Sequence, residues 1–310
     1  MRVAVRAPLA AALAAGLTIA AGVAHAAARP SEAALLARYA PLLLLHPQER
    51  FVPSPVAPFL AGSDLLARAP DGTWAPQPGP LPTSGALGSF RLDVRGCSPA
   101  AALDAVDCYS ALAGRPTAYA AVHRRSGRIV LQYWFFYPYN LWSPIVPPSG
   151  QFWQSHEGDW EEVSVLLDAR LRPVVIAGSR HCAGVRRDWS QAPRRGTRPL
   201  VYVSLGSHAN GFRPGTATVD PKCWPKEGVA VYRAYNVAML DHANAGRTID
   251  PKLVRVTSVA PSWMRFPGTW GEDQYIGFPD VVLRFGAGPI GPAFQDDWRD
   301  PLEMLTWPRG

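Results

Sequence analysis

The sequence predicts an all-β fold, an antiparallel β-sandwich with a few short helices. Runs of β-branched, aromatic and aliphatic residues follow one another through most of the chain, and Pro- and Gly-containing turns separate them. Regular helical patterns do not alternate with these runs. This arrangement argues against a parallel sheet built from βαβ units and favours a sandwich.

The N-terminus has the pattern of a secretory signal peptide. Two arginines precede an Ala-rich apolar run over residues 9–23, and the run ends at Ala24-His25-Ala26. A membrane-spanning helix needs about 20 apolar residues, whereas this run is shorter and is followed by the small residues that signal peptidase recognises. We therefore predict a cleaved signal peptide over residues 1–26, one domain over residues 27–310 and secretion to the extracellular space.

The mature chain has few features of a nucleic-acid-binding or membrane-spanning protein. The whole chain carries a formal charge of +7, and its arginine pairs at 186–187 and 194–195 lie among Ser, Gln, Pro and Gly. Nucleic-acid-binding proteins have denser basic stripes with interleaved aromatic residues. No second apolar run approaches membrane length. We expect no nucleic-acid partner, no transmembrane segment in the mature chain, and a monomer.

Four cysteines, Cys97, Cys108, Cys182 and Cys223, are present. An even number in an exported protein favours disulfides, and three pairings are possible. No C-x-x-C motif occurs, which argues against a thiolate zinc site or a redox centre. We expect the local pairing, Cys97 with Cys108 and Cys182 with Cys223.

The individual elements follow from local patterns. A short helix is expected over residues 31–39, where Ser31 can cap its N-terminus and Pro41 stops it. Residues 47–88 are dense in Pro and Gly and are expected to form irregular surface loops. Only residues 100–106 and 237–243 otherwise look helical. The expected strands cover residues 129–137, 160–167, 173–177, 200–205, 253–259 and 281–285.

The segment His156-Glu157-Gly158-Asp159-Trp160-Glu161 is the strongest candidate for a functional site. In a strand beginning at Asp159, alternation places both Asp159 and Glu161 on the face that carries the apolar residues. A desolvated carboxylate needs a counter-charge or a metal, and a bend at Gly158 would bring His156 towards the same point. Oxygen ligands suit Ca²⁺, Mg²⁺ or Mn²⁺, and a His ligand favours Mn²⁺ or Zn²⁺. A surface ion pair with arginines, beside a structural histidine, is the alternative.

Residues 155–161 (SHEGDWE) resemble the heptapeptide GHRHDWE of the necrosis- and ethylene-inducing protein family. The longer pattern is more similar to the vacuolar protein sorting-associated protein 62 family, whose members often carry an H-x-x-D-W-E segment. Four further stretches match that second family in consistent order: YAPLLLLHP at 39–47, QYWFFYPYN at 132–140, PLVYVSLGSHA at 199–209 and DWRDPL at 297–302.

The resemblance to the necrosis-inducing family implies a β-sandwich related to actinoporins and fungal lectins. It also implies a divalent cation held by the His, Asp and last Glu of the heptapeptide and by an upstream Asp. Those positions are His156, Asp159 and Glu161 here, and Asn140 stands in place of the upstream Asp. An amide brings an oxygen but no charge, so a weaker or different cation site is implied, with Zn²⁺ less favoured than Ca²⁺, Mg²⁺ or Mn²⁺. Gly158 replaces the middle His, so toxin activity is not implied.

Three more residues are candidates for ligand contact. His208 follows the strand expected at 200–205 on a Gly-flanked turn, where site residues are frequent; a histidine that only packs the loop is the alternative. Trp142 and Trp153 flank the Pro-rich loop before the motif. If exposed, they would suit a sugar ring or a lipid headgroup; if buried, they would cap the sandwich.

The sequence therefore supports two main functions. The first is a secreted binding or membrane-active module, in which a cation at His156, Asp159 and Glu161 docks a glycan or a lipid headgroup. The second is a metal-dependent hydrolase, in which the cation activates water and His208 moves protons. No G-x-S-x-G or H-E-x-x-H motif occurs, which favours binding over catalysis. A purely structural acidic cluster is a third possibility.

Overall fold

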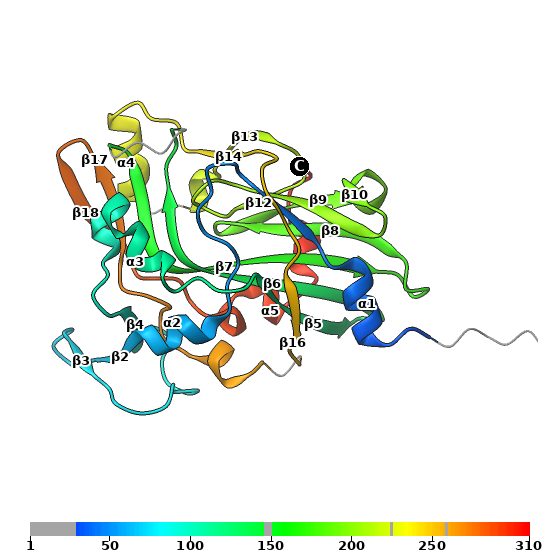
Figure 1. The fold of residues 1–310 in the computed structure, drawn as a ribbon, viewed down its shortest axis with the longest axis horizontal. Coiled ribbons are helices and arrows are strands. Elements are labelled where there is room, and N and C mark those ends of the chain that lie inside the picture. Colours follow the sequence, from blue (N-terminus) through cyan, green and yellow to red (C-terminus); the bar gives the residue numbers. More distant parts are fainter. Residues whose placement is uncertain (1–28, 146–150, 224–225, 258–259) are drawn as a thin grey trace, which may run out of the picture. The chain divides into compact units, whose positions relative to one another are not determined.

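Two β-sheets of the computed structural model face each other and share one apolar core (Figure 1). The structure describes residues 29–145, 151–223, 226–257 and 260–310. The predicted signal peptide lies outside the described residues. Ser31–Gly310 form one compact unit, and no helix of the described residues is long and apolar enough to cross a membrane.

The larger sheet is built around two strands of 15 residues each, β6 (Arg128–Trp142) and β7 (Trp153–Leu167). They pair antiparallel from Ile129 opposite Leu167 to Trp142 opposite Gln154. Their β-branched and aromatic side chains fit a pleated surface that is covered on both sides. The other strands of this sheet are β16 (Lys252–Arg255), β5 (Thr117–Arg125), β17 (Gln274–Phe278), β18 (Val281–Gly286), β8 (Pro173–Arg180) and β9 (Ala183–Asp188).

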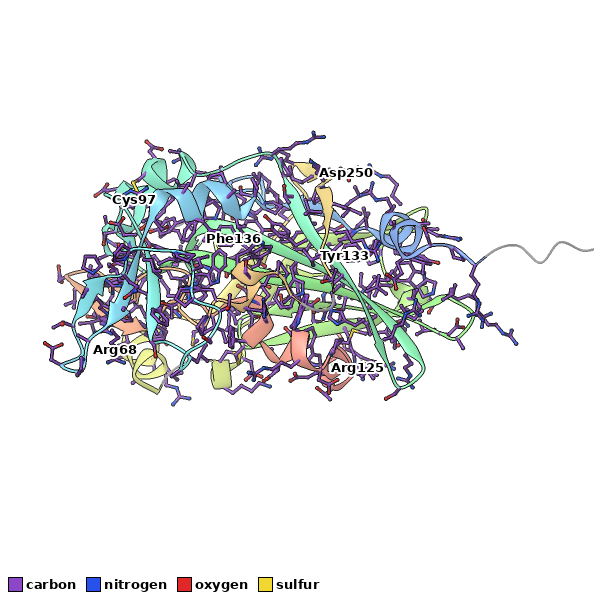
Figure 2. All side chains as sticks on the ribbon, turned by 90° about the horizontal axis from the view of Figure 1, so that it is seen from below. Arg68, Cys97, Arg125, Tyr133, Phe136 and Asp250 are labelled. Carbon is purple, nitrogen blue, oxygen red and sulfur yellow. A yellow bond between two sulfur atoms is a disulfide. The ribbon has the colours of Figure 1, made fainter. Side chains whose placement is uncertain are left out.

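The smaller sheet covers one face of the larger one. It contains β10 (Arg194–Arg195), β11 (Arg198–Val203), β12 (Asn210–Gly211), β1 (Leu42–Leu45) and β15 (Thr248–Ile249). Leu43 of β1 and Val201 of β11 lie in the same buried cluster as Val163 and Val165 of β7. The opposite face of β7 packs an aromatic group in which Trp160 contacts Phe136, Trp263 and Trp270. Figure 2 labels Phe136 and Tyr133 within this densely packed interior.

The predicted all-β sandwich is confirmed, with one difference in strand direction. Most neighbouring strands are antiparallel, but β1 pairs with β11 and β5 pairs with β16 in parallel. Parallel partners require long crossover connections, and periodicity within a short run carries no information about a partner so far along the chain.

The helices agree in part with the predictions. Helix α1 (Glu32–Tyr39) begins after Ser31, whose hydroxyl accepts a 3.2 Å hydrogen bond from the Ala34 amide. The expected helical stretch at 100–106 is a 3₁₀ helix, η1 (Pro99–Ala105), continued by α3 (Val106–Ser110). A helix at 237–243 was wrong: helix α4 (Lys226–Ala234) comes earlier, and β14 (Leu240–Ala243) pairs with β13 (Gly215–Thr218).

The expectation of irregular loops over residues 47–88 was also wrong in part. This stretch contains α2 (Val56–Gly62), β2 (Ser63–Arg68) and β3 (Trp74–Pro76). Together with β4 (Phe90–Val94), the two strands form a separate three-stranded sheet. Prolines at the borders of these elements hid them, because Pro at the edge of a short strand or at the start of a helix does not break it.

Both predicted disulfides are confirmed. Cys97 is bonded to Cys108, which ties the end of β4 to α3. Cys182, in the turn between β8 and β9, is bonded to Cys223. The second bond fixes the turn that carries His181, which matters for the cavity described next.

Candidate functional site

Strand β7 has an open edge at the predicted motif. On that edge β17 pairs with residues 153–155 and β8 pairs with residues 163–167. Between them, residues 156–162 pair only with β6 among the described strands. A cavity of about 380 Å³ lies against this edge, and Asn140, His156, Asp159 and Glu161 are all part of its lining.

Gly158 gives β7 the bend that the site needs. It has a φ of +51°, a left-handed conformation that favours glycine, and a β-carbon added there would collide with the Trp270 carbonyl oxygen. The register with β6 skips Gly158 and Pro138, between the Tyr137–Asp159 and Tyr139–Glu157 pairs, and Pro138 has no N–H to offer to a ladder. The strand begins at Trp153 and not at Asp159 as expected, so His156 lies inside it.

The bend sends Glu157 away from the cavity. Its carboxylate accepts hydrogen bonds from the Tyr109 hydroxyl at 2.9 Å and the Glu272 amide at 3.0 Å. Burial raises the pKa of Glu157 to about 8. Glu157 therefore does not replace the carboxylate that is missing at Asn140.

Asp159 belongs to a buried ionic cluster with His208. The His208 Nδ1 donates a 2.8 Å hydrogen bond to Asp159 Oδ2, and the His208 Nε2 lies 3.6 Å from Glu49 Oε1. The Tyr137 ring stacks on this imidazole, with ring centroids 3.8 Å apart. The Glu49 carboxylate also accepts hydrogen bonds from the Gly206 and Phe51 amides, at 2.7 and 2.8 Å.

The opposite charges of this cluster stabilise one another. Burial alone would lower the pKa of His208, but the Glu49 and Asp159 carboxylates outweigh it and raise this pKa to about 9. In turn, the imidazolium outweighs the effect of burial on both carboxyls and lowers the pKa of Glu49 and Asp159. An imidazolium between two carboxylates is the state that these contacts favour at neutral pH.

His208 is fully buried and is not part of the cavity lining. This differs from the expectation of an accessible histidine that contacts a ligand or transfers protons. Its turn is strained, with a φ of +53°, and the ionic contacts to Glu49 and Asp159 compensate for that conformation. Glu49 was missed in the sequence, because no local pattern in its Pro-rich stretch connects it to residues more than 100 positions away.

Of the predicted carboxyl groups, that of Glu161 has no positively charged partner among the described residues. Its carboxylate accepts hydrogen bonds from the Ser179 hydroxyl and from Asn210 Nδ2. Burial, with the nearby Asp159 carboxylate, raises the pKa of Glu161 well above its ordinary value. A carboxyl of this kind gains a counter-charge if a cation binds next to it.

His156 is held in the tautomer that can ligate a cation. Its Nδ1 lies 3.2 Å from the Glu157 and Gly158 carbonyl oxygens. Because carbonyl oxygens only accept, Nδ1 carries the proton and Nε2 carries the lone pair. Burial lowers the pKa of His156, which keeps the imidazole neutral. Metal-binding histidines use this arrangement, with one ring N–H on a carbonyl and the other nitrogen on the metal.

Asn140 completes the predicted set. Its Oδ1 is buried and has no hydrogen-bond partner, as expected of a ligand oxygen awaiting a cation or a polar atom. Among the described residues, however, no three His, Cys, Asp or Glu side chains are already grouped to hold a metal ion. Asp159 is engaged by His208, and Glu161 by Ser179. A cation would have to draw these side chains together, so the metal site stays a prediction.

A second polar group on the cavity wall was not predicted. His181 Nε2 lies 3.2 and 3.1 Å from the two Asp241 carboxylate oxygens, and the Ser207 hydroxyl donates to Asp241 Oδ1 at 2.7 Å. His181 and Ser207 line the cavity. His181 has a φ of +53°, and the adjacent disulfide fixes its turn. Asp241 is 60 residues from His181 along the chain, so no local pattern indicates this group.

Trp142 and Trp153 are buried, and neither lines the cavity. Neither side chain is therefore placed to contact a ligand in the cavity. The Trp142 indole donates a 3.1 Å hydrogen bond to the Leu240 carbonyl, and the Trp153 ring packs over Gly277 of β17, where any side chain would collide with it. Both rings fill the end of the sandwich, which is the alternative that the sequence left open.

The chain matches the family model of vacuolar protein sorting-associated protein 62 over residues 25–278. It belongs to this family. The predicted resemblance is thus confirmed for the Vps62 family. A relative is the vacuolar protein sorting-associated protein TDA6 of Saccharomyces cerevisiae, 25% identical over 209 residues. That match covers 58% of this chain and 44% of the yeast protein, so the Vps62-family chain spans less than half of its relative.

Solved structures similar to this Vps62-family chain come from the necrosis-inducing group. NLPPya in complex with glucosamine is 14% identical, with 85% of this chain and 86% of that chain covered and a TM-score of 0.41. Necrosis and ethylene inducing protein 2, from the causal agent of cocoa's witches' broom disease, is 16% identical, with 73% and 74% covered and a TM-score of 0.33. Similarity at this level concerns the fold alone.

Proposed function

We propose that this protein is a secreted, cation-dependent binding module. A divalent cation in the β7 cavity, held by Asn140, His156, Asp159 and Glu161, would dock a hydroxyl-rich ligand, a glycan or a lipid headgroup. The observation that carries the proposal is that these four residues, from two strands, line one cavity. Three of the four donors are oxygens, which favours Ca²⁺, Mg²⁺ or Mn²⁺ over Zn²⁺.

The charge of the cavity supports a cationic occupant. Among the described residues that line it there are several Asp and Glu side chains but no Lys or Arg. Glu161 has a raised pKa, and the Asn140 Oδ1 lacks a partner. A cation would stabilise the carboxylates and satisfy the amide oxygen at once.

The neutral polar groups support a hydroxyl-rich ligand. Gln154, Gln274 and Gln295 are part of the same lining. Their Nε2 groups donate to Gln274 Oε1 and to the Ala287 and Ile290 carbonyls, so the Gln154 and Gln295 amides would meet ligand hydroxyls through their acceptor oxygens. With the cation supplying charge, such a lining can recognise a polyol without any apolar platform, and the buried positions of Trp142 and Trp153 are consistent with that.

The buried position of His208 favours binding over hydrolysis. A general acid or base must come within hydrogen-bond reach of a reacting atom, whereas His208 is 0% exposed and its two ring nitrogens face Asp159 and Glu49. The ring protons of His208 therefore face Asp159 and Glu49 and not a substrate. A hydrolase mechanism in which His208 transfers protons is not supported by this position.

Calorimetric titration of chelator-treated protein with Ca²⁺, Mg²⁺, Mn²⁺ and Zn²⁺ tests the cation. We expect one cation per chain and a higher melting temperature when it binds. Glu161→Gln should abolish both effects, and Asn140→Asp should increase the affinity for a hard cation because it adds a charge. Asp64→Asn, an exposed carboxylate paired with Arg95, is the control. Equal binding by Glu161→Gln and the unmodified protein would place the cation elsewhere.

The ligand is tested on arrays of glycans and of lipid vesicles, with and without EDTA. Binding that EDTA and Glu161→Gln both remove supports the cavity as the docking site. If the protein cleaves an ester or a glycoside in a metal-dependent way, and Glu161→Gln abolishes this cleavage, the protein is a hydrolase and not a binding module.

A further inference from the structure

A second cleft, of about 710 Å³, lies where α1, β5, the end of β16 and α5 (Asp296–Arg299) meet. Its lining has the opposite charge to that of the β7 cavity. Four guanidinium groups, those of Arg124, Arg125, Arg255 and Arg299, and one carboxylate, that of Glu32, contribute to it. Four positive charges and one negative charge leave a surplus of +3. None of these residues lines the β7 cavity.

Two of the arginines already hold a carboxylate between them. Glu32 Oε1 lies 3.2 Å from Arg124 Nη2, and Glu32 Oε2 forms an ion pair with Arg255 Nη2. Arg124 and Arg255 come from β5 and β16, which pair side by side. The separation of the two guanidinium groups therefore suits an anion that offers two oxygens.

The other two arginines have no acidic partner. Within the described part of the chain, neither Arg125 nor Arg299 has a carboxylate within 4.0 Å, and both side chains are exposed. Among the described residues, therefore, no carboxylate neutralises the charge of Arg125 or Arg299. Guanidinium groups bind oxyanions through two parallel N–H groups, and this makes arginine the preferred residue for phosphate.

The inner wall of the cleft contains a buried polar atom without a partner. His123, which lines the cleft, is 5% exposed, and its Nε2 has no hydrogen-bond partner. Its ring meets the Trp298 ring edge-on, with centroids 4.8 Å apart. Burial, with the Arg125 charge, lowers the pKa of His123 to about 4, so the ring is neutral and can offer an oxyanion an N–H, in the tautomer protonated at Nε2, but no charge. Buried polar atoms of this kind usually have a partner, protein or otherwise.

We infer that this cleft is an anion site for a phosphate monoester, in which Arg125 and Arg299 supply the unneutralised charge and Glu32 competes with the ligand for Arg124 and Arg255. A phosphate monoester fits better than a carboxylate or a sulfate ester because it carries close to two negative charges at neutral pH, against a surplus of three positive ones. The site is independent of the cation proposed at β7.

Titration with inorganic phosphate at low ionic strength, followed by calorimetry, tests the charge arrangement. We expect the Arg125→Gln/Arg299→Gln double variant to bind phosphate about five- to tenfold more weakly, since exposed charge interactions contribute up to about 1 kcal/mol each. Glu32→Gln should bind about two- to fivefold more tightly, because it removes the competing carboxylate. Melting temperatures of all variants verify that they are folded.

Arg68→Gln is the matched control. Arg68 is also an exposed arginine without a carboxylate within 4.0 Å among the described residues, and Figure 2 shows it at the opposite end of the molecule from Arg125. It should leave phosphate binding unchanged. If Arg68→Gln weakens phosphate binding as much as the double variant does, or if Glu32→Gln does not tighten it, the binding reflects general surface charge and the proposal is overturned.

The source of the phosphate is decided by two further probes. Vesicles that contain phosphatidic acid present the monoester on a membrane, and a soluble sugar phosphate presents it on a glycan. Sensitivity to Arg125→Gln/Arg299→Gln with either probe supports the site and identifies the source. If the double variant binds both probes as tightly as the unmodified protein does, the proposal is overturned.

Discussion

His208 and Asp159 are 49 residues apart in the chain, yet the His208 Nδ1 lies 2.8 Å from Asp159 Oδ2 with both side chains buried. Glu49 approaches the other ring nitrogen, so three segments of the chain meet in one ionic cluster. Removing one member of a buried charged group leaves the others uncompensated, at a cost of about 3–5 kcal/mol. The cluster thus fixes the wall of the β7 cavity.

The cluster predicts a loss of stability at alkaline pH. The pKa of His208 is raised from 6.5 in the unfolded chain to about 9 in the folded one, so its contribution is complete below pH 6.5 and is lost as the pH rises through 9. We expect the free energy of unfolding to fall by on the order of 2–3 kcal/mol across this window. Urea unfolding in EDTA from pH 6 to pH 9 measures it.

Glu157 acts in the same direction, because its folded-state pKa is raised to about 8; its contribution is lost as the pH rises from the ordinary Glu value through 8. His208→Gln should therefore flatten the alkaline part of the curve, and Glu157→Gln the part nearer neutrality. A free energy of unfolding that increases from pH 6.5 to pH 9 would contradict the assigned charges.

Gly158→Ala should destabilise the protein strongly. The added methyl group would collide with the Trp270 carbonyl oxygen, in addition to the cost of a φ of +51°. Together these effects should reduce the free energy of unfolding by about 3 kcal/mol or more. Gly127→Ala is the control, since Gly127 has a φ of +72° with nothing within 4 Å of the new methyl. It should lose only about 1 kcal/mol, and equal losses would refute the steric explanation.

Asp241→Asn should be costly, unlike a similar change at the surface. Asp241 is 1% exposed and accepts hydrogen bonds from Ser207 and His181, which, with Arg180 nearby, keep its pKa low despite burial. We expect a loss of about 2–4 kcal/mol in chemical denaturation. Asp250→Asn breaks the exposed pair with Arg198 and should lose no more than about 1 kcal/mol. Similar losses for both would mean that the His181–Asp241 group contributes little.

If the protein is exported as predicted, the mature chain should have a defined N-terminus and two disulfides. Intact-mass analysis of secreted material should give a chain that begins at or near Ala27, because residues 24–26 form the expected cleavage site. With disulfides between Cys97 and Cys108 and between Cys182 and Cys223, none of the four thiols should be alkylated without reduction. A full-length product with free thiols would contradict export.

Local pattern was sufficient for the central strands β6 and β7, the first helix and the disulfides. The aromatic and β-branched run that became β6 fits a pleated, buried surface wherever it is placed, and Ser31 can cap a helix using only the amides that follow it. Cys97 and Cys108 are 11 residues apart, and their pairing leaves Cys182 and Cys223, 41 residues apart, to bond to each other, so proximity along the chain was a good guide. The motif at 156–161 was also recognisable, because residue type and spacing within one strand determine which face each side chain occupies.

Only the tertiary structure decided what surrounds that motif. The open edge of β7 exists because β8 and β17 pair with different parts of the strand, and strand pairing depends on segments far apart in the sequence. For the same reason Glu49 and Asp241 could not be foreseen as the partners of His208 and His181. Residue type alone made His208 a candidate for proton transfer, but burial, a property of the packed chain, made it part of the ionic cluster.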